Sequence, residues 1–172
     1  MKARLVHQTY RGFTRGNDPG EAMDVGLRPK IKAWLYQMGI HGYTINDDLS
    51  IDVDDVDDIV NLNGLGLAEF PDHVKFGRIG GGFYCSYNWL RSLKGCPETV
   101  GGNFYCNSNI LDSLAGCPET VGHSFNCEGN HLVSLEGCPR TVAENFYCHG
   151  NRKMFTEKEI RKLCEVGENI YL

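Results

Sequence analysis

The sequence lacks a run of apolar residues near the roughly 20 that a membrane-spanning helix needs. Its first residues, MKARLVHQTYRGFTRG, lack the apolar stretch of a signal peptide. Basic residues are also outnumbered: there are 17 Lys and Arg and 22 Asp and Glu, which gives a net charge of −5. These absences argue against a membrane protein, signal-peptide export and general nucleic-acid binding. We therefore expect a reducing cytoplasm, or a particle assembled in one.

What the sequence has instead is a repeat of 21 residues. Its copies read GGGFYCSYNWLRSLKGCPETV, GGNFYCNSNILDSLAGCPETV, GHSFNCEGNHLVSLEGCPRTV and the shortened AENFYCHGNRKMF. The aligned positions are Phe83, Phe104, Phe125 and Phe146; Cys85, Cys106, Cys127 and Cys148; Asn88, Asn109, Asn130 and Asn151; and Leu90, Leu111 and Leu132. A fixed period of this length is typical of solenoids, in which each unit buries its apolar face against its neighbours.

The residue types within one unit predict its local structure. In Phe-x-Cys, both side chains lie on the same face of a short strand. The Asn follows where the chain must turn, and its amide would satisfy backbone groups there, so that stacked copies form a ladder. Leu-x-x-Leu then returns to the core, and a Val or Ile near Gly-Cys-Pro closes the coil. We expect one short parallel sheet.

This pattern, Phe-x-Cys-x-x-Asn-x-Leu-x-x-Leu, resembles the leucine-rich repeat with Phe and Cys at two of its Leu places. More specifically, GCPxxVGGxFxC is similar to repeats in uncharacterised proteins of tailed bacteriophages. The stretches YTINDDLSIDV and RGFTRGNDPGEAM resemble the lead-in and leader of those proteins. The resemblance implies an α/β fold, a short leucine-rich-repeat-like solenoid with a parallel sheet, an N-terminal helix and strand cap and a C-terminal helix cap.

Four segments follow from these patterns. We expect residues 1–20 to form a basic, partly flexible arm that carries Arg4, Arg11 and Arg15, and residues 21–59 to form the N-terminal cap. The cap contains a helix over 29–39 and a strand around Ile51. Residues 60–155 form the solenoid, with 60–82 as a longer first coil offset by 23 residues. Residues 156–172 form the C-terminal cap, where Thr156 and Glu159 make a capping box before a helix over about 157–165 that buries Ile160, Leu163 and Cys164.

The eight cysteines favour core packing over chemistry. No CxxC spacing suits zinc, and a ladder of thiols does not converge on a metal. Inter-strand disulfides need a geometry that adjacent strands seldom offer, and no base stands near a thiol in sequence. The acidic run from Asp47 to Asp58 leaves three interpretations open, which are a solvated turn, a partial calcium loop and a mimic of nucleic acid. We expect no metal, no cofactor and no catalytic residue.

The strand face opposite the core is the candidate binding site. We expect it to be concave, as in many solenoids. Tyrosines and neighbouring polar residues form two predicted rows along it, Tyr84, Tyr105, Asn126 and Tyr147 and, beside them, Ser86, Asn107, Glu128 and His149. Aromatic residues on exposed surfaces are favoured anchors of protein interfaces.

Taken together, these features favour a non-enzymatic protein-binding module with no direct contact to nucleic acid or membrane. The phage resemblance implies a virion-associated accessory protein in the host cell cytoplasm or the virion, whose partner is a virion component. The alternatives are an inhibitor of a host enzyme or defence protein, a small enzyme or metal-binding protein, and a self-assembling homo-oligomer.

Overall fold

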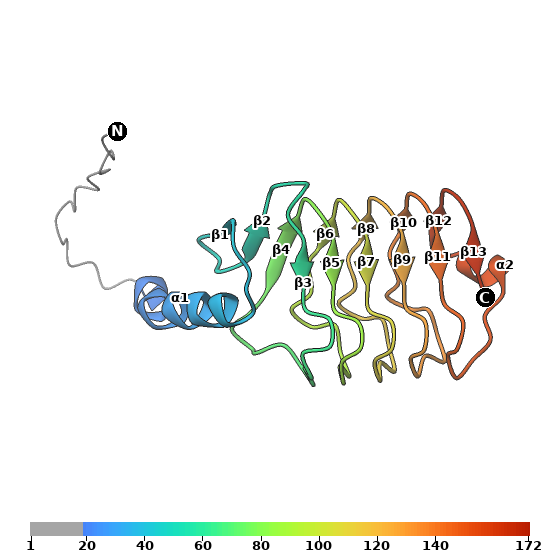
Figure 1. Cartoon of the computed structure of the whole chain (residues 1–172), viewed down its shortest axis with the longest axis horizontal. Coiled ribbons are helices and arrows are strands. Elements are labelled where there is room, and N and C mark those ends of the chain that lie inside the picture. The colour runs from blue at the N-terminus through green and yellow to red at the C-terminus, as the bar shows by residue number, and fades with distance from the viewer. Residues whose placement is uncertain (1–18) are drawn as a thin grey trace.

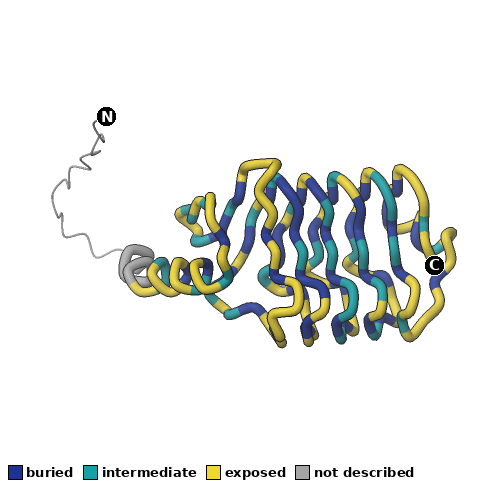
Figure 2. Tube along the Cα trace, in the orientation of Figure 1, coloured by how far each residue is buried: buried dark blue, intermediate teal, exposed yellow. Residues whose placement is uncertain are grey.

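The computed structural model describes residues 19–172, and it is a short β-solenoid, which confirms the predicted fold class. Coils are stacked along the long axis of the molecule, with α1 (Pro19–Gln37) at one end and α2 (Glu157–Ile160) at the other (Figure 1). Each regular coil contributes one strand to each of two sheets. Buried residues follow one another along the inside of the coils, and the outer turns are exposed (Figure 2).

We call the two sheets by their solvent-facing residues. The threonine sheet has the order β1-β2-β4-β6-β8-β10-β12. Its strands are Tyr43–Ile45, Ile51–Val53, Phe76–Ile79, Thr99–Val100, Thr120–Val121, Thr141–Val142 and Glu165–Val166. The tyrosine sheet has the order β13-β11-β9-β7-β5-β3. Its strands, in chain order from β3, are Val60–Asn61, Phe83–Tyr84, Phe104–Tyr105, Phe125–Asn126, Phe146–Tyr147 and Ile170–Tyr171. All neighbours are parallel except β1 and β2.

The 21-residue repeat sets the register of the tyrosine sheet. Phe83 pairs with Phe104, which pairs with Phe125 in the next coil. The rings of Phe83 and Phe104 are stacked, with centroids 5.7 Å apart and planes 8° apart. The predicted offset of 23 residues for the first coil is also correct, because Val60 pairs with Phe83. Identical rings are therefore stacked along the core axis from Phe83 to Phe125, and the next ring, Phe146, is tilted by 51°.

The threonine sheet is the main feature that the sequence did not predict. Its regular strands contain only Thr and Val, with Val100 buried and Thr99 partly exposed. Two residues are too few for an alternating pattern to reveal a strand. The sheet is held by bonds between coils, such as Gly101 N–H to the carbonyl oxygen of Ile79 at 2.8 Å.

The predicted asparagine ladder is present. The Asn109 amide donates to the carbonyl oxygens of Cys85 (3.0 Å) and Cys106 (3.1 Å), which lie in successive coils. Its own oxygen accepts from Leu90 N–H at 3.0 Å. Asn130 repeats this arrangement one coil on, and no buried side-chain nitrogen or oxygen among residues 26–172 lacks a partner. The ladder thus supplies hydrogen bonds where the strands end and the turns begin.

The N-terminal helix differs from its predicted bounds. The amphipathic pattern predicted a helix over 29–39, but α1 begins at Pro19, continues through Pro29 and ends at Gln37. Ile31 and Leu35 are fully buried, and the Trp34 ring lies 6.3 Å from the rings of both Phe70 and Phe76. No helix among residues 19–172 is both long and apolar enough to cross a membrane.

The C-terminal segment also departs from the prediction. The capping box of Thr156 and Glu159 is present, but α2 ends at Ile160 instead of about residue 165. Glu165 N–H donates to the Arg140 carbonyl oxygen at 2.8 Å, so strand pairing with β10 takes over from the helix. Leu163, expected in the core, is 53% exposed. The last coil is therefore completed by β12 and β13, and the helix is only one turn of it.

Candidate functional site

The tyrosine row lies in register on the outer face of the tyrosine sheet. Tyr84 pairs with Tyr105, Tyr105 with Asn126, and Asn126 with Tyr147, so the structure brings the four predicted residues into one line. The rings of Tyr84 and Tyr105 lie 5.2 Å apart at 52°. Each of the four side chains is partly exposed while its strand neighbours Phe and Cys are buried.

Tyr171 extends this row beyond the predicted set. It pairs with Tyr147, and the two rings stack 4.5 Å apart with planes 5° apart. The sequence contains the signal for it, because ENIYL at residues 168–172 repeats ENFYC at 144–148. The match was missed because the spacing is 24 residues, which breaks the period of 21.

The second predicted row is only partly available at the surface. Ser86 is buried, 2% exposed, and its hydroxyl donates to Asn107 Oδ1 at 2.5 Å, so it acts inside the sheet. Glu128 is half-buried; its Oε1 lies 2.8 Å from His149 Nδ1, and its Oε2 accepts from Asn126 Nδ2 at 3.2 Å. These partners fix the carboxylate beside the tyrosine row.

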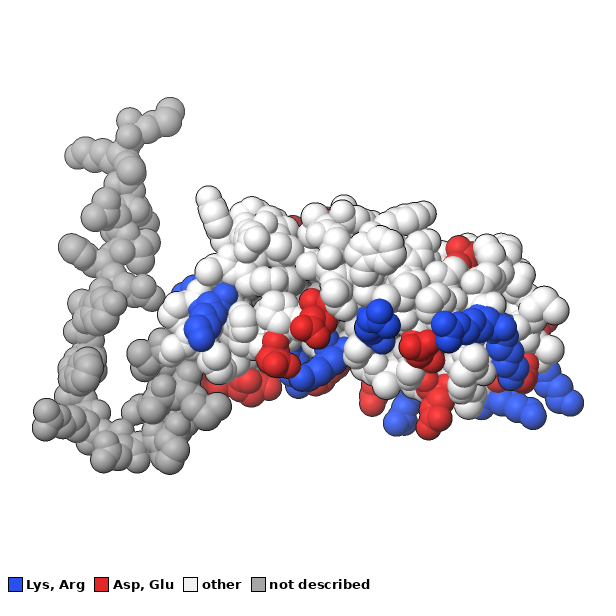
Figure 3. Space-filling model, turned by 90° about the horizontal axis from the view of Figure 1, so that it is seen from below, with Lys and Arg blue, Asp and Glu red and all other residues white. Residues whose placement is uncertain are grey.

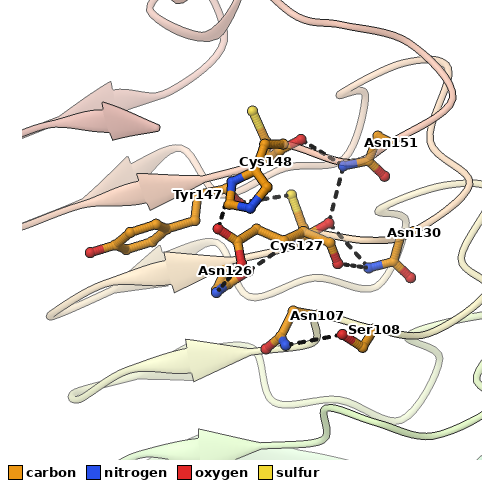
Figure 4. Close-up of polar contacts among 10 residues, drawn as sticks. Asn107, Ser108, Asn126, Cys127, Asn130, Tyr147, Cys148 and Asn151 are labelled. Carbon is orange, nitrogen blue, oxygen red and sulfur yellow. Dashed lines mark hydrogen bonds and ion pairs between the residues drawn. The ribbon is translucent and has the colours of Figure 1, made fainter. Parts of the chain in front are cut away.

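The asparagine ladder lies where the strands of the tyrosine sheet end and the turns begin. Figure 4 shows Asn130 and Asn151 one above the other at the ends of the strands, with Tyr147 projecting at the opposite end of the group. The Asn151 amide donates to the Cys148 carbonyl oxygen at 2.7 Å. The outward tyrosines therefore stand on strands whose far ends are anchored by buried amides.

The face was expected to be concave, but the two large hollows lie elsewhere. One, of about 740 Å³, lies beside Phe70, Lys94 and Cys117. The other, of about 620 Å³, runs over the threonine sheet past Thr99, Thr120 and Thr141. Neither includes a residue of the tyrosine row. Gly80, Gly101 and Gly122 also line the hollow over the threonine sheet, and they have no side chains to fill it.

The cysteine thiols are poorly suited to nucleophilic chemistry. All eight are free, and six of them are buried. Burial raises the pKa of the Cys138 thiol to about 11, and burial with the nearby Glu128 raises the pKa of Cys148 to about 11. Burial likewise raises the pKa of Cys164 to about 12. A thiol that stays protonated is a weak nucleophile and a weak metal ligand.

The acidic run is engaged in local hydrogen bonds. Asp52 accepts from Asn46 Nδ2 at 2.9 Å and from the Arg78 backbone N–H at 2.7 Å, and the Asp54 carboxylate pairs with the Arg78 guanidinium at 2.5 Å. Within the described chain, no group of three or more His, Cys, Asp or Glu is arranged to hold a metal ion. The basic arm residues Arg4, Arg11 and Arg15 lie outside the described residues.

Comparison with known proteins adds no further assignment. No family model, no curated protein and no solved structure matches the chain. Any function must therefore be inferred from the geometry of the described residues and from the sequence.

Proposed function

We propose that this protein is a non-enzymatic binding module that holds a partner protein on the outer face of its tyrosine sheet. The observation that carries the proposal is the row of Tyr84, Tyr105, Tyr147 and Tyr171, ordered in register by strands of a rigid core. Tyrosine offers a large contact area at low cost in side-chain entropy and is enriched in protein interfaces. With strands about 4.8 Å apart, the six-stranded sheet spans about 24 Å along this row.

The surrounding atoms support binding because the row is organised before a partner arrives. Tyr147 and Tyr171 are already stacked, and the Tyr84 hydroxyl accepts from Asn103 Nδ2 at 3.4 Å. Side chains held in place lose less freedom on association, so more of the contact energy appears as affinity. We also propose, on the likeness of the repeat to phage proteins, that the protein is a bacteriophage accessory protein and that the partner is a virion component.

The test is to purify a tagged copy of the full chain from its natural host and identify the proteins that accompany it. A Tyr84→Ala, Tyr105→Ala, Tyr147→Ala variant should lose the partner, because it removes the contact area of the row. The matched control is Thr99→Ala, Thr120→Ala, Thr141→Ala, which changes three residues of the threonine sheet and should retain it. Urea unfolding shows whether each variant is folded. A partner kept by the folded tyrosine variant would contradict the proposal.

A further inference from the structure

The tyrosine sheet differs from the rest of the molecule in its charge. The five regular segments that form its outer face read GGFYCSY, GNFYCNS, HSFNCEG, ENFYCHG and ENIYL. They contain no Lys or Arg but three glutamates, Glu128, Glu144 and Glu168. All three glutamates belong to the last three coils, so the acidic half of the face is the half with Tyr147 and Tyr171.

Elsewhere, several carboxylates form ion pairs with Lys or Arg. Figure 3 shows Lys, Arg, Asp and Glu side chains gathered together along the turns of one side of the molecule. Lys94 lies 2.7 Å from Asp72, and Arg152 lies 3.4 Å from Asp112. Two glutamates of the tyrosine sheet instead accept from neutral groups, Glu144 from the Ser124 hydroxyl at 3.1 Å and Glu168 from Asn145 Nδ2 at 3.0 Å. The third, Glu128, lies 2.8 Å from His149 Nδ1. The Arg161 guanidinium reaches only the backbone carbonyl oxygen of Glu168, at 3.5 Å, and donates to the carboxylate of Glu157.

Two of the glutamates are close in sequence to the stacked tyrosine pair, since Glu144 lies three residues before Tyr147 and Glu168 three residues before Tyr171, whose strands pair in register. The pKa of the Tyr147 phenol is raised by partial burial, then by the neighbouring Tyr171 and by Glu128, Glu168 and Glu144. The two rings cover each other's inner faces, but Tyr171 is 44% exposed. An exposed aromatic ring and the carboxylates of the same paired segments together attract a cation.

We propose that the stacked pair of Tyr147 and Tyr171, with Glu144 and Glu168, binds an arginine side chain presented by the partner protein. The inference depends on the proposed function, since it specifies what the same face recognises. A guanidinium is planar, so it stacks flat on an aromatic ring and pairs with a carboxylate through two parallel N–H groups, a geometry that the tetrahedral ammonium of lysine lacks. Nucleic acid and anionic membranes are disfavoured at this half of the face because its charge is negative.

The other half of the tyrosine row lacks charge, and this difference predicts the orientation of a bound partner segment. Tyr84 and Tyr105 are tilted at 52° instead of stacked, and their neighbours Asn103, Ser86 and Asn107 are neutral. A partner segment lying along the row would place its arginine over the C-terminal coils and neutral residues over β5 and β7. The two halves therefore differ in the residue each one selects.

The test uses hexa-arginine and hexa-lysine peptides as probes, titrated calorimetrically into the full chain at physiological salt. Hexa-arginine should bind more tightly than hexa-lysine. The double variant Glu144→Gln, Glu168→Gln should weaken hexa-arginine roughly tenfold or more, since charge-assisted bonds are lost. The double variant Glu69→Gln, Glu136→Gln makes the same change in net charge away from the face and should leave the affinity within about twofold, because exposed charges are screened at this salt.

The inference is overturned if both double variants weaken hexa-arginine equally, if hexa-lysine binds as tightly, or if Tyr171→Ala leaves binding unchanged. Repeating the host purification separates this outcome from failure of the proposed function. If the partner is retained by Glu144→Gln, Glu168→Gln but lost by the triple tyrosine variant, the binding face stands and the arginine proposal is wrong. If both variants retain the partner, the proposed binding face is also wrong.

Discussion

The two sheets stack the same coils in the same order but use different side chains on both faces. Inside, the tyrosine sheet contributes Phe104 and its equivalents, whereas the threonine sheet contributes Val121 and its equivalents. Outside, one carries aromatic rings and the other carries hydroxyls over a hollow of about 620 Å³. The spacing between strands is common to both. Because the strand spacing is the same, the difference comes from side-chain size. Tyrosines give the tyrosine sheet a large contact area, whereas the smaller threonines leave the threonine sheet hollow.

The largest effect should come from the inner faces. Phe104→Ala should lower the free energy of unfolding by about 4 kcal/mol, because it removes a fully buried ring stacked on two others. Val121→Ala, at the equivalent place in the threonine sheet, should cost about 2 kcal/mol. Urea unfolding followed by circular dichroism measures both. Equal losses would contradict the view that the aromatic stack dominates the core.

A somewhat smaller effect should follow at the strand ends. Asn130→Ala should cost about 3 kcal/mol, because Leu111 N–H and the Cys106 carbonyl oxygen lose a buried partner. Asn151→Ala, at the half-buried last rung, should cost about 1 kcal/mol since water replaces part of the lost bonding. The same unfolding experiment compares the two. A larger loss at Asn151 would show that the end of the ladder, and not its interior, limits stability.

Thiol reactivity should distinguish the loop that leads into the threonine sheet, which contains Cys138, from the interior of the tyrosine sheet. With a pKa of about 11 against the ordinary 9.0, Cys138 in the folded protein should react with iodoacetamide at pH 8 roughly 100-fold more slowly than an unperturbed thiol. Cys127, fully buried beneath the tyrosine sheet, should be slower still and react only on unfolding. Mass spectrometry of timed samples gives both rates. Labelling of Cys127 ahead of Cys138 would refute this order.

The smallest effect should appear where both sheets end, at the capping box. Hydrogen bonds from Lys153 and Thr156 lower the pKa of Glu159 to about 2 from 4.5. A carboxylate with a lowered folded-state pKa stabilises the fold fully above pH 4.5, and this contribution disappears as the pH falls toward 2. Glu159→Gln should therefore reduce the pH dependence of the unfolding midpoint between pH 4.5 and 2. An unchanged slope would mean that these bonds do not persist in solution.

The sequence predicted the core of this molecule better than its surface and the ends of its helices. Phe83, Cys85 and Asn88 recur with fixed chemistry, so a constant period translated directly into register, burial and the amide ladder. The first coil was also predicted, since Val60 and Leu62 occupy the Phe and Cys places. Interior positions are predictable because each coil must match its neighbour in size and polarity.

The outer features were harder to predict because they depend on contacts between coils that the repeat pattern of the sequence does not reveal. Thr99 and Val100 form a strand only because neighbouring coils offer backbone partners, and Ser86 is buried by a bond to Asn107 one coil away. The end of α2 is decided by competition with pairing to β10. The tyrosine row was placed correctly by counting alternate residues, but the hollows over the threonine sheet had no sequence signal.

The uniform register has a consequence for how the gene can change. Because Phe104 meets Phe125 through the same contacts with which it meets Phe83, an in-frame duplication of one repeat would insert a coil whose two interfaces already exist. Such a duplication would lengthen the outer row by one residue without a new fold. The number of repeats in the gene thus sets the length of the outer row.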